Sequence, residues 1–122
     1  MKELIGNECF NILDSKEYIL FYFGATWCKP CQEILPKLLL LENELNDEII
    51  KFFKIDIDKP ENNLICEKCK IKVVPAFLIF KEREFLDRRK GNQIRKFFFC
   101  NLTFFVLRYT SPNFYTAPPL AP

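Results

Sequence analysis

The chain has 122 residues, the size of a single domain, and 49% of them are hydrophobic, which is typical of a globular protein rather than a disordered one. Its 18 basic and 16 acidic side chains give a net charge of +2, so charge offers no argument for a nucleic-acid partner. Histidine is absent, which excludes Ser-His and Cys-His nucleophile pairs and any histidine-ligated zinc or haem. Six cysteines are left as the side chains with redox chemistry.

The first predicted strand covers residues 17–24, where β-branched and aromatic side chains follow one another without alternation. This pattern is typical of a strand buried on both faces in a sheet that helices cover. A helix is predicted from about Pro30 to residue 45, because leucine and isoleucine recur there at spacings of three and four. Pro36 lies inside this helix and is expected to kink it, since proline lacks the backbone N–H. Residues 1–16 are predicted to be helix-like.

The next elements predicted are a strand over residues 49–58, a helix over 60–70 and a strand over 73–80. A turn over 81–83 then leads to an edge strand over 84–90, and a last helix covers 91–102. The first of these strands ends in alternation, which puts Ile55 and Ile57 on one face. The two helical connections predict parallel strands, and the hairpin predicts antiparallel ones. The whole is therefore predicted to be an α/β fold with a mixed sheet of about four strands, flanked by helices.

The C-terminal part differs in composition, because residues 88–122 carry six basic side chains and no acidic one. Residues 96–107 are densely apolar but too few to span a bilayer. Four of the eight prolines fall within residues 111–122. We therefore predict one domain over residues 1–102 and an extended or disordered tail over 103–122. The alternative is a tail that packs on the domain or on a neighbouring chain.

The N-terminal residues favour a cytoplasmic location. Glu3 and Glu8 occupy a region where a signal peptide needs positive charge, and no continuous apolar stretch follows them. Cysteine pairs at Cys-x-x-Cys spacing also suit redox or metal chemistry in a reducing compartment.

The central motif is Trp27-Cys28-Lys29-Pro30-Cys31, at the junction of a buried strand and a helix N-terminus. Two residues between the cysteines place the sulfurs close enough to form a small disulfide ring. At the helix start, backbone N–H groups, the helix dipole and Lys29 all stabilise a Cys28 thiolate. Cys31 is one turn inside and shielded. The motif predicts disulfide exchange, with Cys28 as nucleophile and Cys31 as resolving thiol.

This motif, Pro36 and the later Val74-Pro75-Ala76-Phe77 together resemble the thioredoxin family over about residues 17–102. The resemblance implies a three-layer thioredoxin fold, disulfide reductase activity and a cis peptide bond before Pro75. It also implies that Val74 offers its backbone to an extended substrate beside the active disulfide. The substrate-binding residues we expect are Trp27, Lys29, Pro30, Val74 and Pro75.

Two departures from the family stand out. Tyr22 occupies the position of a buried aspartate that the family assigns to proton transfer with the resolving cysteine, so Lys54 has lost its expected partner. Phe21-Tyr22-Phe23 is instead similar to the tryparedoxin and nucleoredoxin branch. The stretch before the first strand is shorter than in a full thioredoxin, which suggests a sheet without the first edge strand.

The remaining cysteines have several interpretations. Cys66 and Cys69 form a second Cys-x-x-Cys, which could complete a four-cysteine zinc site or form a regulatory disulfide. We favour two ordinary thiols and no metal site. Cys9 and Cys100 are predicted to be small buried hydrophobes.

The predicted function is that of a protein disulfide reductase without a bound cofactor. The family implies protein or small-molecule disulfides as substrates and, as electron donor, a thioredoxin reductase or a glutathione-linked system. The alternative is a binding or assembly module whose groove and basic C-terminal segment dock a partner. The cluster Arg88-Arg89-Lys90 fits a solvated strand edge better than a docking site.

Overall fold

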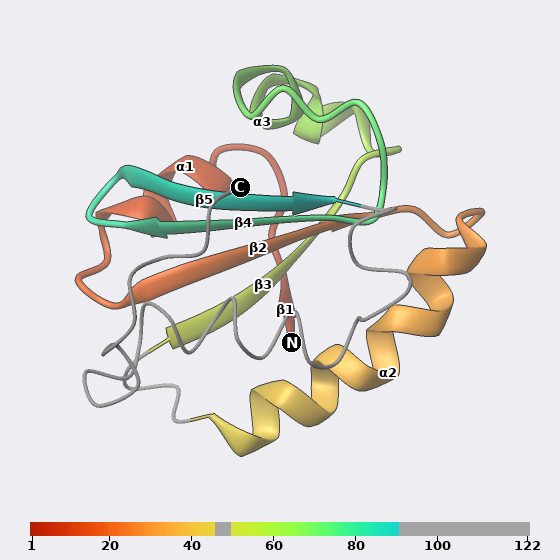
Figure 1. Ribbon diagram of the computed structural model, residues 1–122. Coiled ribbons are helices and arrows are strands. Elements are labelled where there is room, and N and C mark those ends of the chain that lie inside the picture. The colour runs from red at the N-terminus through yellow and green to blue at the C-terminus, as the bar shows by residue number, and fades with distance from the viewer. Residues whose placement is uncertain (46–49, 91–122) are drawn as a thin grey trace.

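The computed structural model describes residues 1–45 and 50–90. A five-stranded sheet forms the centre, with helix α2 on one face and α1 and α3 on the other (Figure 1). The elements in chain order are β1 (Lys2–Glu3), α1 (Glu8–Asn11), β2 (Tyr18–Gly24), α2 (Lys29–Glu44), β3 (Ile50–Asp56), α3 (Asn63–Lys68), β4 (Ala76–Lys81) and β5 (Glu84–Lys90), with 3-10 turns at Ile12–Asp14 and Pro60–Asn62. Helix, sheet and helices make the three layers that the sequence predicts.

The sheet is mixed and has the strand order β1-β3-β2-β4-β5. The central strand β2 pairs in parallel with β3, and the β4–β5 hairpin is antiparallel, both as predicted. The parallel arrangement predicted for the second helical connection is wrong, because β4 pairs antiparallel with β2. The suggestion of a missing first edge strand is wrong. Lys2 and Glu3 pair in parallel with β3, and the Leu4 amide donates to the Lys54 carbonyl at 2.9 Å. A two-residue strand is too short to show any periodicity in the sequence.

Strand β2 is buried on both faces, which confirms the prediction from its unbroken apolar run. Leu20 and Tyr22 pack under α2, whereas Phe21 and Phe23 face the core beneath α1 and α3. The buried positions of α2 are spaced by three and four residues, namely Cys31, Ile34, Leu38 and Leu41. Pro36 lies inside α2 and is exposed. The helix continues past it to Glu44, so the proline does not end the helix.

Strand β4 begins later than predicted, at Ala76, because the chain bends over the three residues before it. The Val74–Pro75 peptide bond is cis, as the family resemblance implies. The helix predicted from Pro60 divides into a 3-10 turn and α3, and Lys70, with a φ of 55°, turns the chain away from the helix. The predicted helix 91–102 and the tail boundary lie outside the described residues. Within the described ranges, no helix is long and apolar enough to cross a membrane.

Candidate active site

Helix α2 begins immediately after the loop that follows β2, and Cys28 is its N-cap residue. The Cys28 backbone is extended, with φ −84° and ψ 109°, and its Sγ accepts the Cys31 N–H at 3.3 Å. Pro30 occupies the first turn, where its missing N–H costs the helix no hydrogen bond. The sequence therefore places the first cysteine where the backbone donors of a helix start point at its sulfur.

Cys28 and Cys31 form a disulfide, with their Cα atoms 5.2 Å apart. Both side chains are buried, Cys28 at 4% and Cys31 at 2% exposure. The Cys28 sulfur lies 3.8 Å from the carbonyl oxygen of Val74, the residue before the cis-proline. The structure thus brings the motif at the start of α2 against the loop before β4, although 46 residues separate Cys28 from Val74.

The other predicted site residues surround this disulfide at different depths. Trp27 is 66% exposed, Lys29 is also exposed, Pro30 is half-buried, and Pro75 is buried beneath the loop. Trp27 and Val74 both line a pocket of about 440 Å³ beside the disulfide. Of the five predicted substrate-binding residues, Trp27 and Val74 line this pocket, whereas Lys29, Pro30 and Pro75 do not.

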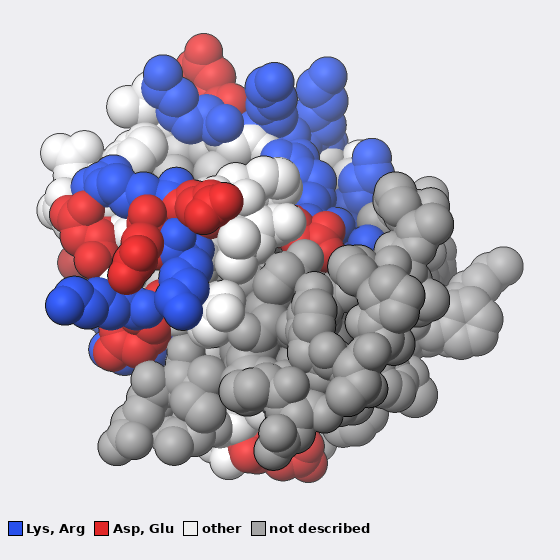
Figure 2. Space-filling view, turned by 60° about the vertical axis from the view of Figure 1, so that its left-hand side comes forward, with Lys and Arg blue, Asp and Glu red and all other residues white. Residues whose placement is uncertain are grey.

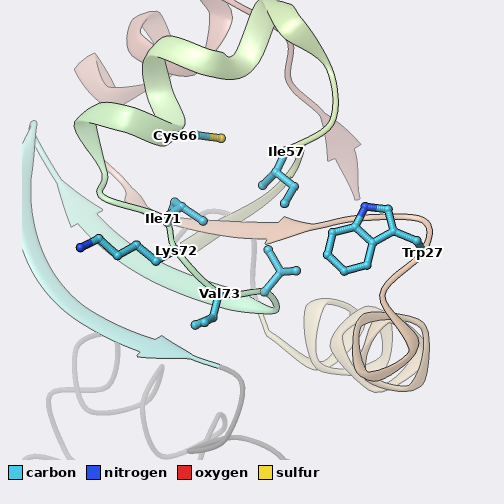
Figure 3. A pocket seen from close by; sticks show the side chains of 7 residues that line it. Trp27, Ile57, Cys66, Ile71, Lys72 and Val73 are labelled. Atoms are coloured by element: carbon cyan, nitrogen blue, oxygen red, sulfur yellow. The ribbon is translucent and has the colours of Figure 1, made fainter.

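Five further residues line this pocket and were not predicted from the sequence, namely Ile57, Cys66, Ile71, Lys72 and Val73. Figure 3 shows the Trp27 indole at one end and Cys66 pointing from α3 toward Ile57. Ile57 follows the alternating end of β3, and that alternation was the only sequence signal for any of them. The lining is largely apolar, and Val73 is 49% exposed, so the pocket can accept an apolar side chain.

A second pocket, of about 260 Å³, reaches Cys31 from the α2 side of the sheet. Tyr22, Lys54 and Asp56 all line it. Lys54 pairs in register with Tyr22, and Asp56 pairs with Gly24, which is why these side chains share one face. The Tyr22 hydroxyl donates to the Cys31 carbonyl at 3.3 Å, and burial raises the pKa of Tyr22 to about 12. The phenol is therefore neutral at physiological pH and is no substitute base for a carboxylate.

The remaining described cysteines are free thiols. Cys9 is fully buried, as predicted, and Cys69 is 8% exposed, whereas Cys66 is half-buried. Burial raises the pKa of both Cys9 and Cys69 to about 11, and it also raises the pKa of Cys66. Among residues 1–45 and 50–90, no three metal-ligating side chains gather closely enough to hold an ion, so the zinc alternative gains no support. Cys100 lies outside the described residues.

Comparisons with known proteins agree with this architecture. The thioredoxin family model matches residues 5–99. Thioredoxin H3 of Arabidopsis thaliana is 39% identical over 78 residues, which are 64% of this chain and 63% of that protein. A thioredoxin of Coprinus comatus is 31% identical over 93 residues, which are 75% of this chain and 86% of that protein. The chain therefore spans somewhat less than two thirds of the length of Thioredoxin H3.

Solved structures show the same fold. The X-ray structure of Fasciola hepatica thioredoxin superposes with a TM-score of 0.76 at 26% identity, over 89% of this chain and 99% of that one. A Malassezia sympodialis thioredoxin superposes with a TM-score of 0.79 at 20% identity, over 91% of both chains. The chain belongs to the thioredoxin family.

Proposed function

We propose that this protein is a thiol–disulfide oxidoreductase that reduces disulfides through Cys28 and Cys31. The observation that carries the proposal is the Cys28–Cys31 disulfide, set at the N-terminus of α2 with the Cys28 sulfur against the Val74 carbonyl. A redox-active pair needs two sulfurs that join and separate without rearranging the fold, and the buried start of one helix meets that need.

Cys28 is the nucleophile in this mechanism. Its thiolate attacks a substrate disulfide, forms a new S–S bond with one substrate sulfur and expels the other as a thiolate. The Cys31 thiolate then attacks the Cys28 sulfur, which releases the second substrate thiol and leaves the disulfide seen in the structure. The substrate gains two electrons, and an external donor must return two to the protein.

The order of the two steps follows from where the sulfurs lie. Cys28 caps the helix, where the Cys31 N–H at 3.3 Å can stabilise its thiolate, and it borders the pocket through its contact with Val74. Cys31 lies one turn further in, beside the pocket that Lys54 and Asp56 line. Since the chain has no histidine and Tyr22 is neutral, neither an imidazole nor a phenolate takes the Cys31 proton.

Substrate binding uses the residues around the larger pocket. An extended substrate segment lies along Val74, which stands outside the sheet ladder because β4 begins at Ala76. Trp27, Lys29 and Pro30 contact it from the other side. Protein disulfides are the substrates, and a thioredoxin reductase or a glutathione-linked system is the electron donor. A reducing, cytoplasmic location suits this direction of electron flow.

The experiment measures reduction of a neutral disulfide peptide by protein that dithiothreitol has reduced. The wild type and Cys9→Ala, a control that removes a free thiol outside the pocket, should both reduce the peptide, whereas Cys28→Ser should lose the activity. Cys31→Ser should accumulate a mixed disulfide with the peptide that reductant dissolves. Equal rates for the wild type and Cys28→Ser would reject the enzyme. Complexes with peptide or protein that persist in the presence of reductant would support the binding module instead.

A further inference from the structure

Cationic side chains gather on one side of the pocket beside the disulfide. Lys68, the last residue of α3, is followed at alternate positions by Lys70 and Lys72, and all three are exposed. Glu67 is the one acidic residue within 66–74. Figure 2 shows Lys and Arg side chains along the upper edge of the molecule, with an acidic group among them. Figure 1 places α3 at the same height, and lower down in Figure 2 acidic and basic side chains mix more evenly.

The edge strand β5 adds to this cluster and is fixed against it. The Arg88 guanidinium donates hydrogen bonds to the Lys70 carbonyl at 3.1 Å and to the Cys69 carbonyl. Lys90, at the end of β5, pairs in register with Ala76, the residue after the cis-proline. We call Lys68, Lys70, Lys72, Arg88 and Lys90 the basic rim.

The acidic side chain at this end of β5 does not neutralise the rim. Asp87 pairs with Arg89 on the same strand, at 3.7 Å between Oδ2 and Nη2, and its Oδ1 accepts the Arg88 amide at 2.7 Å. Asp87 thus has a cationic partner in Arg89, a residue outside the rim, and the five rim cations outnumber the carboxylates of Glu67 and Asp87. The rim therefore keeps a net positive charge beside the pocket.

Lys72 joins the rim to the pocket. It belongs to the pocket lining, and in Figure 3 its amine points away from Trp27, along the hairpin strands. Lys72 is two residues from Val74, a span of at most ~7 Å between Cα atoms. A substrate segment that places its cysteine at Cys28, beside Val74, therefore has its next residues within reach of the Lys72 amine.

We propose that this surface selects protein disulfides in extended segments that carry acidic side chains on the rim side and an apolar side chain next to the cysteine. This inference rests on the proposed function and names its substrate class. The apolar side chain enters the pocket between Trp27 and Val73, and the acidic ones meet Lys72 and the rest of the rim. Because the four lysines of the rim are exposed, their attraction acts mainly on association and is weakened by salt.

The test uses three peptides that share one intramolecular disulfide and one flanking leucine, and that carry acidic, neutral or basic residues beyond it. Full-length wild type should reduce the acidic peptide with a kcat/KM at least ~5-fold above the neutral one at low salt, and the basic peptide more slowly still. At 0.5 M salt the three values should converge. Equal values for all three peptides at low salt would overturn the inference while leaving the oxidoreductase intact.

A matched pair of charge reversals locates the effect. Lys72→Glu should lower the ratio of kcat/KM for the acidic and neutral peptides by ~3-fold or more. Lys16→Glu makes the same charge change at an exposed position before β2, at the far end of a strand roughly 20 Å long, and should keep the wild-type ratio. The same fall in both variants would mean that net charge, and not the rim, selects the peptide. Failure of the wild type to reduce any peptide would instead reject the proposed function.

Discussion

The Tyr22 hydroxyl donates a hydrogen bond to the Cys31 carbonyl at 3.3 Å, so the central strand holds the first turn of α2 from below. The Tyr22 ring is 1% exposed and stacks on Phe77, with the ring centroids 5.4 Å apart. It also lies over Gly24, two residues along the same face of β2. At the position where the family resemblance implies an aspartate for proton transfer, this chain has a tyrosine whose hydroxyl supports the turn.

The contact between Tyr22 and Gly24 predicts a large effect of a small substitution. In Gly24→Ala, the new Cβ would stand 2.5 Å from the Tyr22 hydroxyl oxygen and 2.7 Å from the adjacent ring carbon. Phe77 stacks against the ring and blocks its movement on that side. We expect the free energy of unfolding to fall by ~1–3 kcal/mol, measured by urea denaturation of the oxidised protein.

A compensating substitution separates this clash from a general intolerance of side chains at position 24. Tyr22→Leu removes the ring, so adding Gly24→Ala to Tyr22→Leu should cost less than Gly24→Ala costs in the wild type. Equal costs in the two backgrounds would show that the ring is not what excludes a Cβ.

Burial of Tyr22 predicts how stability changes at alkaline pH. Its pKa is raised to about 12 from 10.0, so the folded state favours the neutral phenol. That contribution is fully present below pH 10 and is lost as the pH rises toward 12, for a total of roughly 2–3 kcal/mol. Urea denaturation between pH 8 and 11.5 should show a steeper loss for the wild type than for Tyr22→Phe. Parallel curves would contradict the assignment.

The same substitution also tests whether Tyr22 takes part in the chemistry. A phenol with a pKa of about 12 carries its proton throughout the range in which the enzyme is assayed. Tyr22→Phe should therefore keep the shape of the pH–rate profile between pH 6 and 9, even if the lost hydrogen bond lowers stability by ~1 kcal/mol. A shifted profile would give Tyr22 a role in moving the Cys31 proton.

The core of the fold and the Cys28–Cys31 pair can be predicted from local sequence patterns. The unbroken apolar run of β2 predicts a doubly buried strand, and the spacing of apolar residues in α2 predicts the helix face that covers it. Cys28 and Cys31 are three residues apart, so their pairing needs no knowledge of the fold. The cis bond before Pro75 follows from the family resemblance alone.

Features built from distant segments could not be predicted. The larger pocket joins Trp27 with Ile57 and with Ile71 and Val73, which come from three separate segments, and no periodicity links them. Strand β1 is defined by two residues and the hydrogen bonds around them. The sequence predicts a solvated strand edge at Arg88, but in the structure the backbone carbonyls of Cys69 and Lys70, after α3, accept hydrogen bonds from its guanidinium. Each depends on tertiary contacts that local propensity does not encode.

Accessibility predicts the order in which the free thiols react. Cys66 lines the open pocket, whereas Cys9 and Cys69 are buried and have a pKa of about 11. Iodoacetamide at pH 8 should modify Cys66 of the oxidised native protein at least ~10-fold faster than either buried thiol. Peptide mass spectrometry of timed samples measures the rates, and urea-unfolded protein, in which the rates should become equal, is the control. Equally fast modification of Cys69 in the native state would contradict the buried placement.

Asn62 is the buried polar side chain of the described core, and its hydrogen bonds tie the N-terminal segment to the end of β3. Its Oδ1 accepts the Gly6 amide at 2.8 Å, and its Nδ2 donates to the Asp56 carbonyl at 2.8 Å. Asn62→Leu would leave the half-buried Gly6 amide without this acceptor and would remove one of the two donors to the Asp56 carbonyl, which also accepts the Lys59 amide at 3.4 Å. We therefore expect the free energy of unfolding to fall by roughly 1–3 kcal/mol. Thermal and urea denaturation measure the loss.

The Asn62→Asp variant tests separately the hydrogen bond that Asn62 accepts and the one that it donates. Asn62→Asp keeps an acceptor for the Gly6 amide but loses the donor to the Asp56 carbonyl. It also buries a negative charge close to Asp56, whose side chain is itself a carboxylate. It should therefore be less stable than the wild type at pH 7 and recover as the pH falls and the new carboxyl becomes protonated. Asn63→Asp changes the neighbouring exposed amide in the same way and is the control. If both aspartate variants match the wild type at pH 7, the hydrogen bonds of Asn62 do not hold the N-terminal segment in place.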